Sequence, residues 1–115
     1  MPIEALRGAD VVFLLARRSS EAVGCGALVD RAGRYGELKR MYVRPSCRRL
    51  GAGWAILDAL VAQARSRGLP CLRLETGIAQ PEALALYERA GFRRRGPFDT
   101  YVEDPLSLFM ELSLG

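Results

Sequence analysis

Short apolar runs bounded by charged and turn-forming residues fill the first part of the chain. Residues 10–18 contain the run VVFLLA, residues 22–30 are small and apolar, and residues 37–44 alternate imperfectly before Pro45. Runs of this length with such boundaries are typical of β-strands. Three of them in succession predict an antiparallel meander.

The hydrophobic period then changes from two to between three and four. Apolar side chains recur at this spacing at Leu50, Trp54, Leu57, Val61 and Ala64. This pattern predicts an amphipathic helix over residues 50–64, with Gly68 and Pro70 as stop signals.

The rest of the chain alternates between the two periods. Residues 71–76 predict a strand, residues 81–90 a helix that starts at a proline, residues 92–95 a short strand, and residues 106–114 a last strand. The order β-β-β-α-β-α-β-β indicates an α+β (mixed α/β) fold, a sheet covered by two helices. Without an internal repeat or linker, residues 1–115 form one predicted domain.

The amino-acid composition excludes several classes of function. The 115 residues contain no histidine, which excludes Ser-His-Asp and Cys-His catalysis and any histidine metal site within them. The three cysteines form no C-x-x-C pair, which favours a reducing compartment. The apolar runs are too short to cross a bilayer. We therefore expect a cytoplasmic protein without a metal or a membrane partner.

A candidate anion site precedes the first predicted helix. Gly51 and Gly53 let the backbone approach a ligand, and Arg48 and Arg49 add positive charge beside them. Free N–H groups at a helix start bind phosphates, so the segment predicts a phosphate or pyrophosphate site. It matches neither a Walker A loop nor a G-x-G-x-x-G fingerprint.

Two motifs in order give a specific resemblance. Arg48-x-x-Gly51-x-Gly53 matches the pyrophosphate motif of the GNAT superfamily of acetyl-coenzyme A-dependent N-acetyltransferases. Residues 83–92 resemble that superfamily's A-x-x-L-Y-x-x-x-G-F signature. The resemblance runs from about residue 13 to the C-terminus. It implies a mixed, mostly antiparallel sheet that splays between residues 37–44 and 71–76, with acetyl-coenzyme A in the gap.

The resemblance also implies roles for the residues around that gap. The pantetheine arm would pair with the backbone of Met41 and Val43, and an N–H near Met41 or Tyr42 would polarise the thioester carbonyl. Backbone N–H groups after Arg48 would hold the pyrophosphate. The cofactor-binding residues implied are Met41, Tyr42, Val43, Arg48, Arg49, Leu50, Gly51, Ala52, Gly53 and Trp54.

Acetyl transfer needs a group that takes a proton from the amine and a group that protonates the leaving sulfur. Tyr87 matches the superfamily position that protonates the sulfur. Glu37 has the spacing of a general base, and a strand period of two places it on the same face as Met41 and Val43. Glu75, on the other strand of the gap, is the second candidate for the base.

The N-terminal segment is shorter than the resemblance implies. GNAT domains begin with a strand and two helices, whereas only a stub is expected before residue 10. We expect an acceptor site that is open or completed by another subunit. The exposed sheet edge would favour a homodimer, with strand exchange as one form.

Three functions remain at this point. The first is transfer of acetyl from acetyl-coenzyme A to a primary amine of a small molecule or a protein. The second is a catalytically idle coenzyme A-binding or interaction module. The third, nucleic-acid binding through the +4 net charge, is disfavoured because acidic residues intersperse the arginines and only 8% of residues are aromatic.

Overall fold

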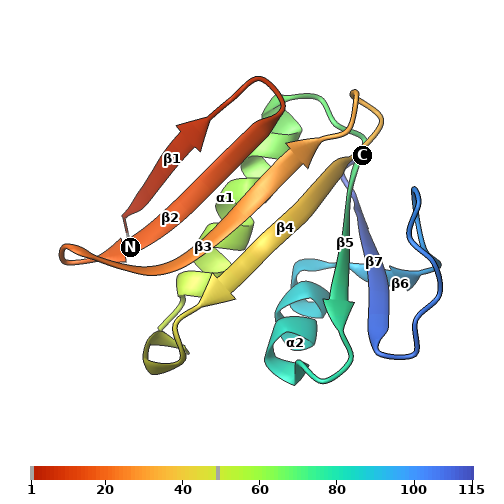
Figure 1. Cartoon of the computed structure of the whole chain (residues 1–115). Coiled ribbons are helices and arrows are strands. Elements are labelled where there is room, and N and C mark those ends of the chain that lie inside the picture. Colours follow the sequence, from red (N-terminus) through yellow and green to blue (C-terminus); the bar gives the residue numbers. More distant parts are fainter. Residues whose placement is uncertain (1, 49) are drawn as a thin grey trace.

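A seven-stranded sheet carries the fold over residues 2–48 and 50–115, the residues that the computed structural model describes (Figure 1). Its strand order is β1-β2-β3-β4-β5-β7-β6, and only the β4–β5 pair is parallel. The strands are β1 (Ile3–Arg7), β2 (Val11–Arg18), β3 (Glu21–Asp30), β4 (Gly36–Val43), β5 (Cys71–Gly77), β6 (Arg93–Arg95) and β7 (Ser107–Ser113). The helices are α1 (Ala52–Ser66) and α2 (Pro81–Ala90), with a short 3₁₀ turn over Pro45–Cys47. The predicted α+β class is confirmed.

The N-terminal segment is a strand rather than a stub. Strand β1 pairs antiparallel with β2 along its whole length, from Ile3 opposite Ala16 to Arg7 opposite Val12. Ile3 and Ala5 pack against the main core, while Glu4 lies 2.6 Å from Arg17. Sequence reading missed this strand because two inward apolar side chains are too few to show a period of two.

Helix α1 begins two residues later than predicted and buries a different stripe. Its buried side chains are Ala52, Ile56, Leu57, Leu60 and Ala64. Leu50 precedes the helix and is exposed, and Trp54 is only partly covered. The helix packs across β2, β3 and β4, where small residues make room for it. A Cβ on Gly26 would lie 2.6 Å from the sulfur of Met41 and 2.8 Å from Ile56.

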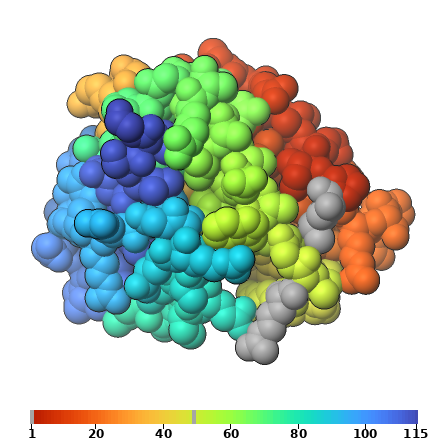
Figure 2. Space-filling view, turned by 180° about the vertical axis from the view of Figure 1, so that it is seen from behind, coloured from red at the N-terminus to blue at the C-terminus, as the bar shows by residue number. Residues whose placement is uncertain are grey.

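The two faces of the sheet differ in what covers them. Helix α1 lies behind β2, β3 and β4 in Figure 1, and Figure 2 shows α1 and α2 exposed on the molecule's back. The other face carries a smaller aromatic cluster of Tyr35, Phe98 and Phe109, with Tyr101 and Cys71 packed against it. Neither α1 nor α2 combines the length and hydropathy needed to cross a bilayer.

Strands β4 and β5 part soon after they pair. Only Gly36 with Leu72 and Glu37 with Arg73 are paired across them. Beyond these two rungs the strands diverge, and α2 lies beside the opening (Figure 1). The splay predicted between these two strands is therefore confirmed. It leaves the β5-facing edge of β4 without a neighbouring strand from Leu38 to Val43.

Candidate active site

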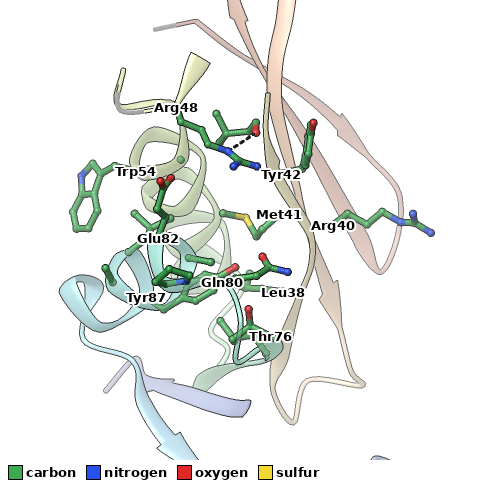
Figure 3. Close-up of a pocket in the computed structure, with 18 of the residues that line it drawn as sticks. Leu38, Arg40, Met41, Tyr42, Arg48, Trp54, Thr76, Gln80, Glu82 and Tyr87 are labelled. Carbon is green, nitrogen blue, oxygen red and sulfur yellow. Dashed lines mark hydrogen bonds between the residues drawn. The ribbon is translucent and has the colours of Figure 1, made fainter. Parts of the chain in front are cut away.

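A cleft of about 1240 Å³ occupies the gap between β4 and β5 (Figure 3). Its walls come from four elements that the two-rung splay brings together: the end of β4, the start of α1, the end of β5 and α2. Of the residues predicted to bind a cofactor, those that line it are Met41, Tyr42, Val43, Arg48, Gly51, Gly53 and Trp54. Leu50 and Ala52 are not among the lining residues, and Arg49 lies outside the described residues.

The start of α1 forms one end of the cleft. Gly51 is the N-cap residue with a left-handed φ of 84°, a conformation that glycine adopts without strain. No side chain caps the helix, and its first turn contains no acidic residue. Gly53 faces α2, since a Cβ there would lie 3.3 Å from Leu86. The first N–H groups of α1 are thus free to bind an anion.

Arginine side chains strengthen this end of the cleft. The Nε of Arg48 donates a 3.2 Å hydrogen bond to the carbonyl oxygen of Val43, which fixes the guanidinium at the end of β4 (Figure 3). The guanidinium of Arg89 on α2 stacks on the Trp54 ring at 4.6 Å and joins α2 to α1. The predicted anion site therefore has two arginine side chains near it, with the carboxylate of Glu82 on α2 also lining this end of the cleft (Figure 3).

Tyr87 lies on α2 with its ring inside the fold and lines the cleft. Its side chain is 5% exposed and packs edge-on against Phe92, with ring centres 5.7 Å apart. Burial raises the pKa of the phenol to about 12. Its hydroxyl hydrogen-bonds to none of the described side chains, so its proton remains available to a group in the cleft.

A β-bulge in β4 overturns the predicted placement of Glu37. The register with β3 shifts between Cys25 and Ala27, and Arg40 has a φ of 58°. One extra residue in a strand moves everything before it to the opposite face. In Figure 3 Met41 points toward the helices and Arg40 points away from them. Glu37 consequently lies on the face opposite Met41 and Val43.

Glu37 is instead the buried centre of a polar network. It is 2% exposed, and its Oε1 accepts hydrogen bonds from Nε of Arg31 at 3.0 Å and from Nη2 at 2.8 Å. Its Oε2 accepts a 2.6 Å bond from the hydroxyl of Tyr101. Both oxygens are occupied, and Glu37 does not line the cleft. Its general-base role stays a prediction that this geometry does not favour.

Glu75 does reach the cleft. It lies on the last part of β5, exposed, and hydrogen-bonds to none of the described residues. It pairs across β5 and β7 with Phe109 of the aromatic cluster, and directly opposed residues of a sheet share a face. Glu75 therefore lies at the mouth of the cleft opposite the helices, where its carboxylate can accept a proton from a group in the cleft.

Comparison with known proteins agrees with this arrangement. The sequence profile described as "Acetyltransferase (GNAT) family" matches residues 3–92. The chain belongs to the GNAT acetyltransferase family. It is 48% identical to the IAA acetyltransferase of Azospirillum brasilense over 99% of this chain and 75% of that relative. It is 41% identical to the N-acetyltransferase YsnE of Bacillus subtilis over 97% of this chain and 76% of YsnE.

Solved structures share the fold of this GNAT chain. An acyl-CoA N-acyltransferase assigned in Klebsiella pneumoniae superposes with a TM-score of 0.89 at 47% identity, over 96% of this chain and 77% of that one. The PaiA N-acetyltransferase of Thermoplasma acidophilum was solved with coenzyme A. It superposes with a TM-score of 0.79 at 23% identity over 90% of this chain and 61% of its own.

Sequence reading missed two residues near the cleft, Lys39 and Tyr101. Lys39 lines the cleft and its Nζ donates a 3.2 Å hydrogen bond to Tyr101. Tyr101 belongs to a loop that no strand or helix pattern marks, and its contact with β4 spans 62 positions of the chain. No spacing rule relates residues so far apart, so the sequence held no signal for this pair.

Proposed function

We propose that this protein transfers the acetyl group of acetyl-coenzyme A to a primary amine. The observation that carries the proposal is the uncapped, glycine-rich start of α1, which lies at one end of a cleft that also contains the unpaired hydroxyl of Tyr87. Family membership supports acetyl-coenzyme A-dependent acyl transfer in general. That the acetyl group goes to a primary amine is our inference from the site.

The residues of the cleft suit coenzyme A. Gly51 and Gly53 leave space at the start of α1, where backbone N–H groups would hold the pyrophosphate, with Arg48 as a further cation. The open edge of β4 offers backbone groups to the amides of the pantetheine arm. Bound acetyl-coenzyme A supplies the acetyl group as an activated thioester.

Tyr87 is the proposed acid. Its pKa of about 12 keeps the hydroxyl protonated throughout the physiological range. A phenol that is buried, fixed by Phe92 and free of other hydrogen bonds can hold its proton toward the leaving sulfur. Transfer of the proton from Oη would prevent release of a charged thiolate into the cleft.

Glu75 is the proposed base. It is exposed at the mouth of the cleft on the face opposite the helices, so an amine entering from that face meets it before reaching the thioester. Its carboxylate can accept a proton directly or through one water. Glu37 is not the base in this proposal, because its two oxygens already accept hydrogen bonds from Arg31 and Tyr101.

The test is calorimetric titration with acetyl-coenzyme A, comparing wild type with Gly51→Glu. The new carboxylate would lie at the proposed pyrophosphate position. Gly33→Glu is the matched control, because Gly33 also has a positive φ, of 72°, with open space around its Cβ, and lies in a distant turn. Saturable binding that Gly51→Glu abolishes and Gly33→Glu retains supports the cofactor site.

Turnover is tested separately on a panel of amines, by release of free coenzyme A. Binding without transfer to any amine would favour the alternative, an idle coenzyme A-binding or interaction module. Absence of binding by a folded wild-type protein at millimolar ligand would contradict both functions.

The expected homodimer remains a proposal. Leu6 is 60% exposed and Tyr42 52% exposed on the sheet, and β1 presents a free edge, which supports self-association. Light scattering after size exclusion tests it, and a monomer at micromolar concentration would contradict it.

A further inference from the structure

The network around Glu37 joins two cations, Arg31 and Lys39, to one carboxylate. Arg31 forms two hydrogen bonds to Oε1 and so neutralises Glu37. The hydroxyl of Tyr101 donates a hydrogen bond to Oε2 of Glu37. The Nζ of Lys39 lies 3.6 Å from the same oxygen, beyond good hydrogen-bonding distance. Lys39 is therefore the more weakly paired of the two cations, and its contact with Tyr101 uses only one of its three N–H donors.

The position of Lys39 is fixed although its head group is accessible. The side chain is 41% exposed, lies over the Tyr101 ring at 6.0 Å from the centre, and lines the cleft. Its hydrogen bond to Tyr101 raises the pKa of the amine, which keeps it charged at neutral pH. A cation held in this way loses less conformational entropy when it binds an anion than a free lysine does.

The bulge in β4 lies at Arg40, the residue after Lys39. Arg40 follows Lys39, lines the cleft, and forms no ion pair with any carboxylate of the described residues. A non-glycine residue in the left-handed region is strained, and such strain is found at functional sites more often than elsewhere. Here the bulge turns the Arg40 side chain away from the cleft, and of the two consecutive cations Lys39 is the one available to a ligand there (Figure 3).

The carboxylate of Glu75 lies across the opening from Lys39. Glu75 on β5 and Lys39 on β4 both line the cleft and both lie on the face of the aromatic cluster. Two neighbouring carboxylates of this face are already paired, Glu111 with Arg73 and Arg95, and Glu37 with Arg31. The mouth of the cleft thus offers one negative group, Glu75, and one positive group, Lys39, to a ligand.

We propose that the acceptor is an amine that also carries a carboxylate, as an amino acid does, and that Lys39 binds this carboxylate. The amine would then lie toward Glu75, which suits the base role given above. Tyr101 and Glu37 act as positioning residues, because they hold Lys39 and do not reach the ligand. This inference rests on the proposed function and specifies its substrate class.

The first experiment uses matched pairs of acceptors. Initial rates are measured for a series of L-amino acids and for the carboxamide of each, which keeps the side chain and removes the carboxylate charge. Rates are expressed per free-amine concentration, because the carboxamide also lowers the pKa of the neighbouring amine. We expect kcat/KM for the acid to exceed that of the amide by at least about tenfold, since one charge-assisted hydrogen bond contributes about 1.5–3 kcal/mol. Equal values for acid and amide overturn the proposal.

The second experiment changes the cation. Lys39→Met should raise KM for the acids about tenfold or more, with kcat and the values for the amides nearly unchanged, and Lys39→Arg should restore part of the loss. Arg94→Gln is the matched control, an exposed arginine of β6 that does not line the cleft. Equal losses for acids and amides in Lys39→Met would show a structural role only and overturn the proposal.

Binding is measured independently of turnover. Each acid and its amide are titrated calorimetrically into protein saturated with coenzyme A, for wild type and Lys39→Met. Preferential binding of the acid that requires Lys39 supports the inference even if transfer is slow, and equal binding of acid and amide contradicts it. Failure to bind coenzyme A at all would instead refute the proposed function, so the two failures are distinguishable.

Discussion

The hydroxyl of Tyr101 donates a 2.6 Å hydrogen bond to Oε2 of Glu37, although the two residues lie 64 positions apart in the chain. The bond fastens the loop between β6 and β7 to β4 beside the cleft. Aromatic contacts support it: the Tyr101 ring lies 5.1 Å from Phe98 and 5.9 Å from Phe109. The face of the sheet opposite α1 is therefore stabilised by the Glu37–Tyr101 hydrogen bond and by the aromatic rings that pack around it.

Glu37→Gln should lower the free energy of unfolding by about 3 kcal/mol, because it leaves the Arg31 guanidinium beside a buried neutral group. Glu4→Gln serves as the control, since its partner Arg17 and Glu4 itself are both exposed, and it should cost less than about 1 kcal/mol. Urea denaturation measures both values. Similar small losses in the two variants would contradict a stabilising role for the Glu37 network.

Gly26→Ala should destabilise the protein by about 1–3 kcal/mol through overpacking. Its Cβ would meet the Met41 sulfur at 2.6 Å and Ile56 at 2.8 Å, between β3 and α1. Gly96→Ala, where the added carbon meets nothing within 4 Å, should be nearly neutral. Thermal melts of the two variants distinguish them, and an unchanged midpoint for Gly26→Ala would mean that α1 moves freely to make room.

Tyr87→Phe should lower kcat by about 10²-fold or more if the hydroxyl protonates the leaving sulfur. The affinity for coenzyme A should change by less than about twofold, because the ring and its packing against Phe92 remain. With a pKa of about 12, Tyr87 should add no downward limb to the wild-type rate profile below pH 10. A variant that retains full kcat would exclude the acid role.

Tyr87 should also give the protein a specific sensitivity to alkali. Its pKa rises from about 10 in the unfolded chain to about 12 in the folded one, so the folded state binds the proton more tightly. This contribution is fully present below pH 10 and is lost as the pH rises through 12. The stability of wild type relative to Tyr87→Phe should therefore fall by about 2–3 kcal/mol over that interval. Denaturant titrations at pH 9 and at pH 11.5 measure the change, and parallel curves would refute it.

Much of the fold could be predicted because the spacing of apolar residues in each element can be recognised within a short window of sequence. The apolar run of β2, the helix that ends near Gly68 and the alternation of β7 each satisfy one rule over a short window. The glycine turn at Gly51 and the tyrosine of α2 were found in the same way, as short motifs. Strand β1 was missed because its pattern is carried by two residues, Ile3 and Ala5.

The placement of Glu37 could not be predicted because it depends on a non-local feature. A period of two assigns Glu37 and Met41 to one face unless a bulge intervenes, and Arg40 is not a residue type that marks a left-handed position. The cause lies in the partner strand: Gly26, opposite the bulge, sits where α1 approaches β3 and β4. Sequence spacing alone cannot reveal that approach.

The two rungs between β4 and β5 have a mechanical consequence. They make the sheet two smaller sheets, β1–β4 and β5–β7, joined at one end and held along one face by α1 and α2. A ligand with its own amide groups, bound between the strands, would connect the two halves of the sheet reversibly. Amide protons of β4 and β5 near the opening should then exchange faster in the ligand-free protein than those at the joined end. Their exchange rates should fall together when the ligand is bound.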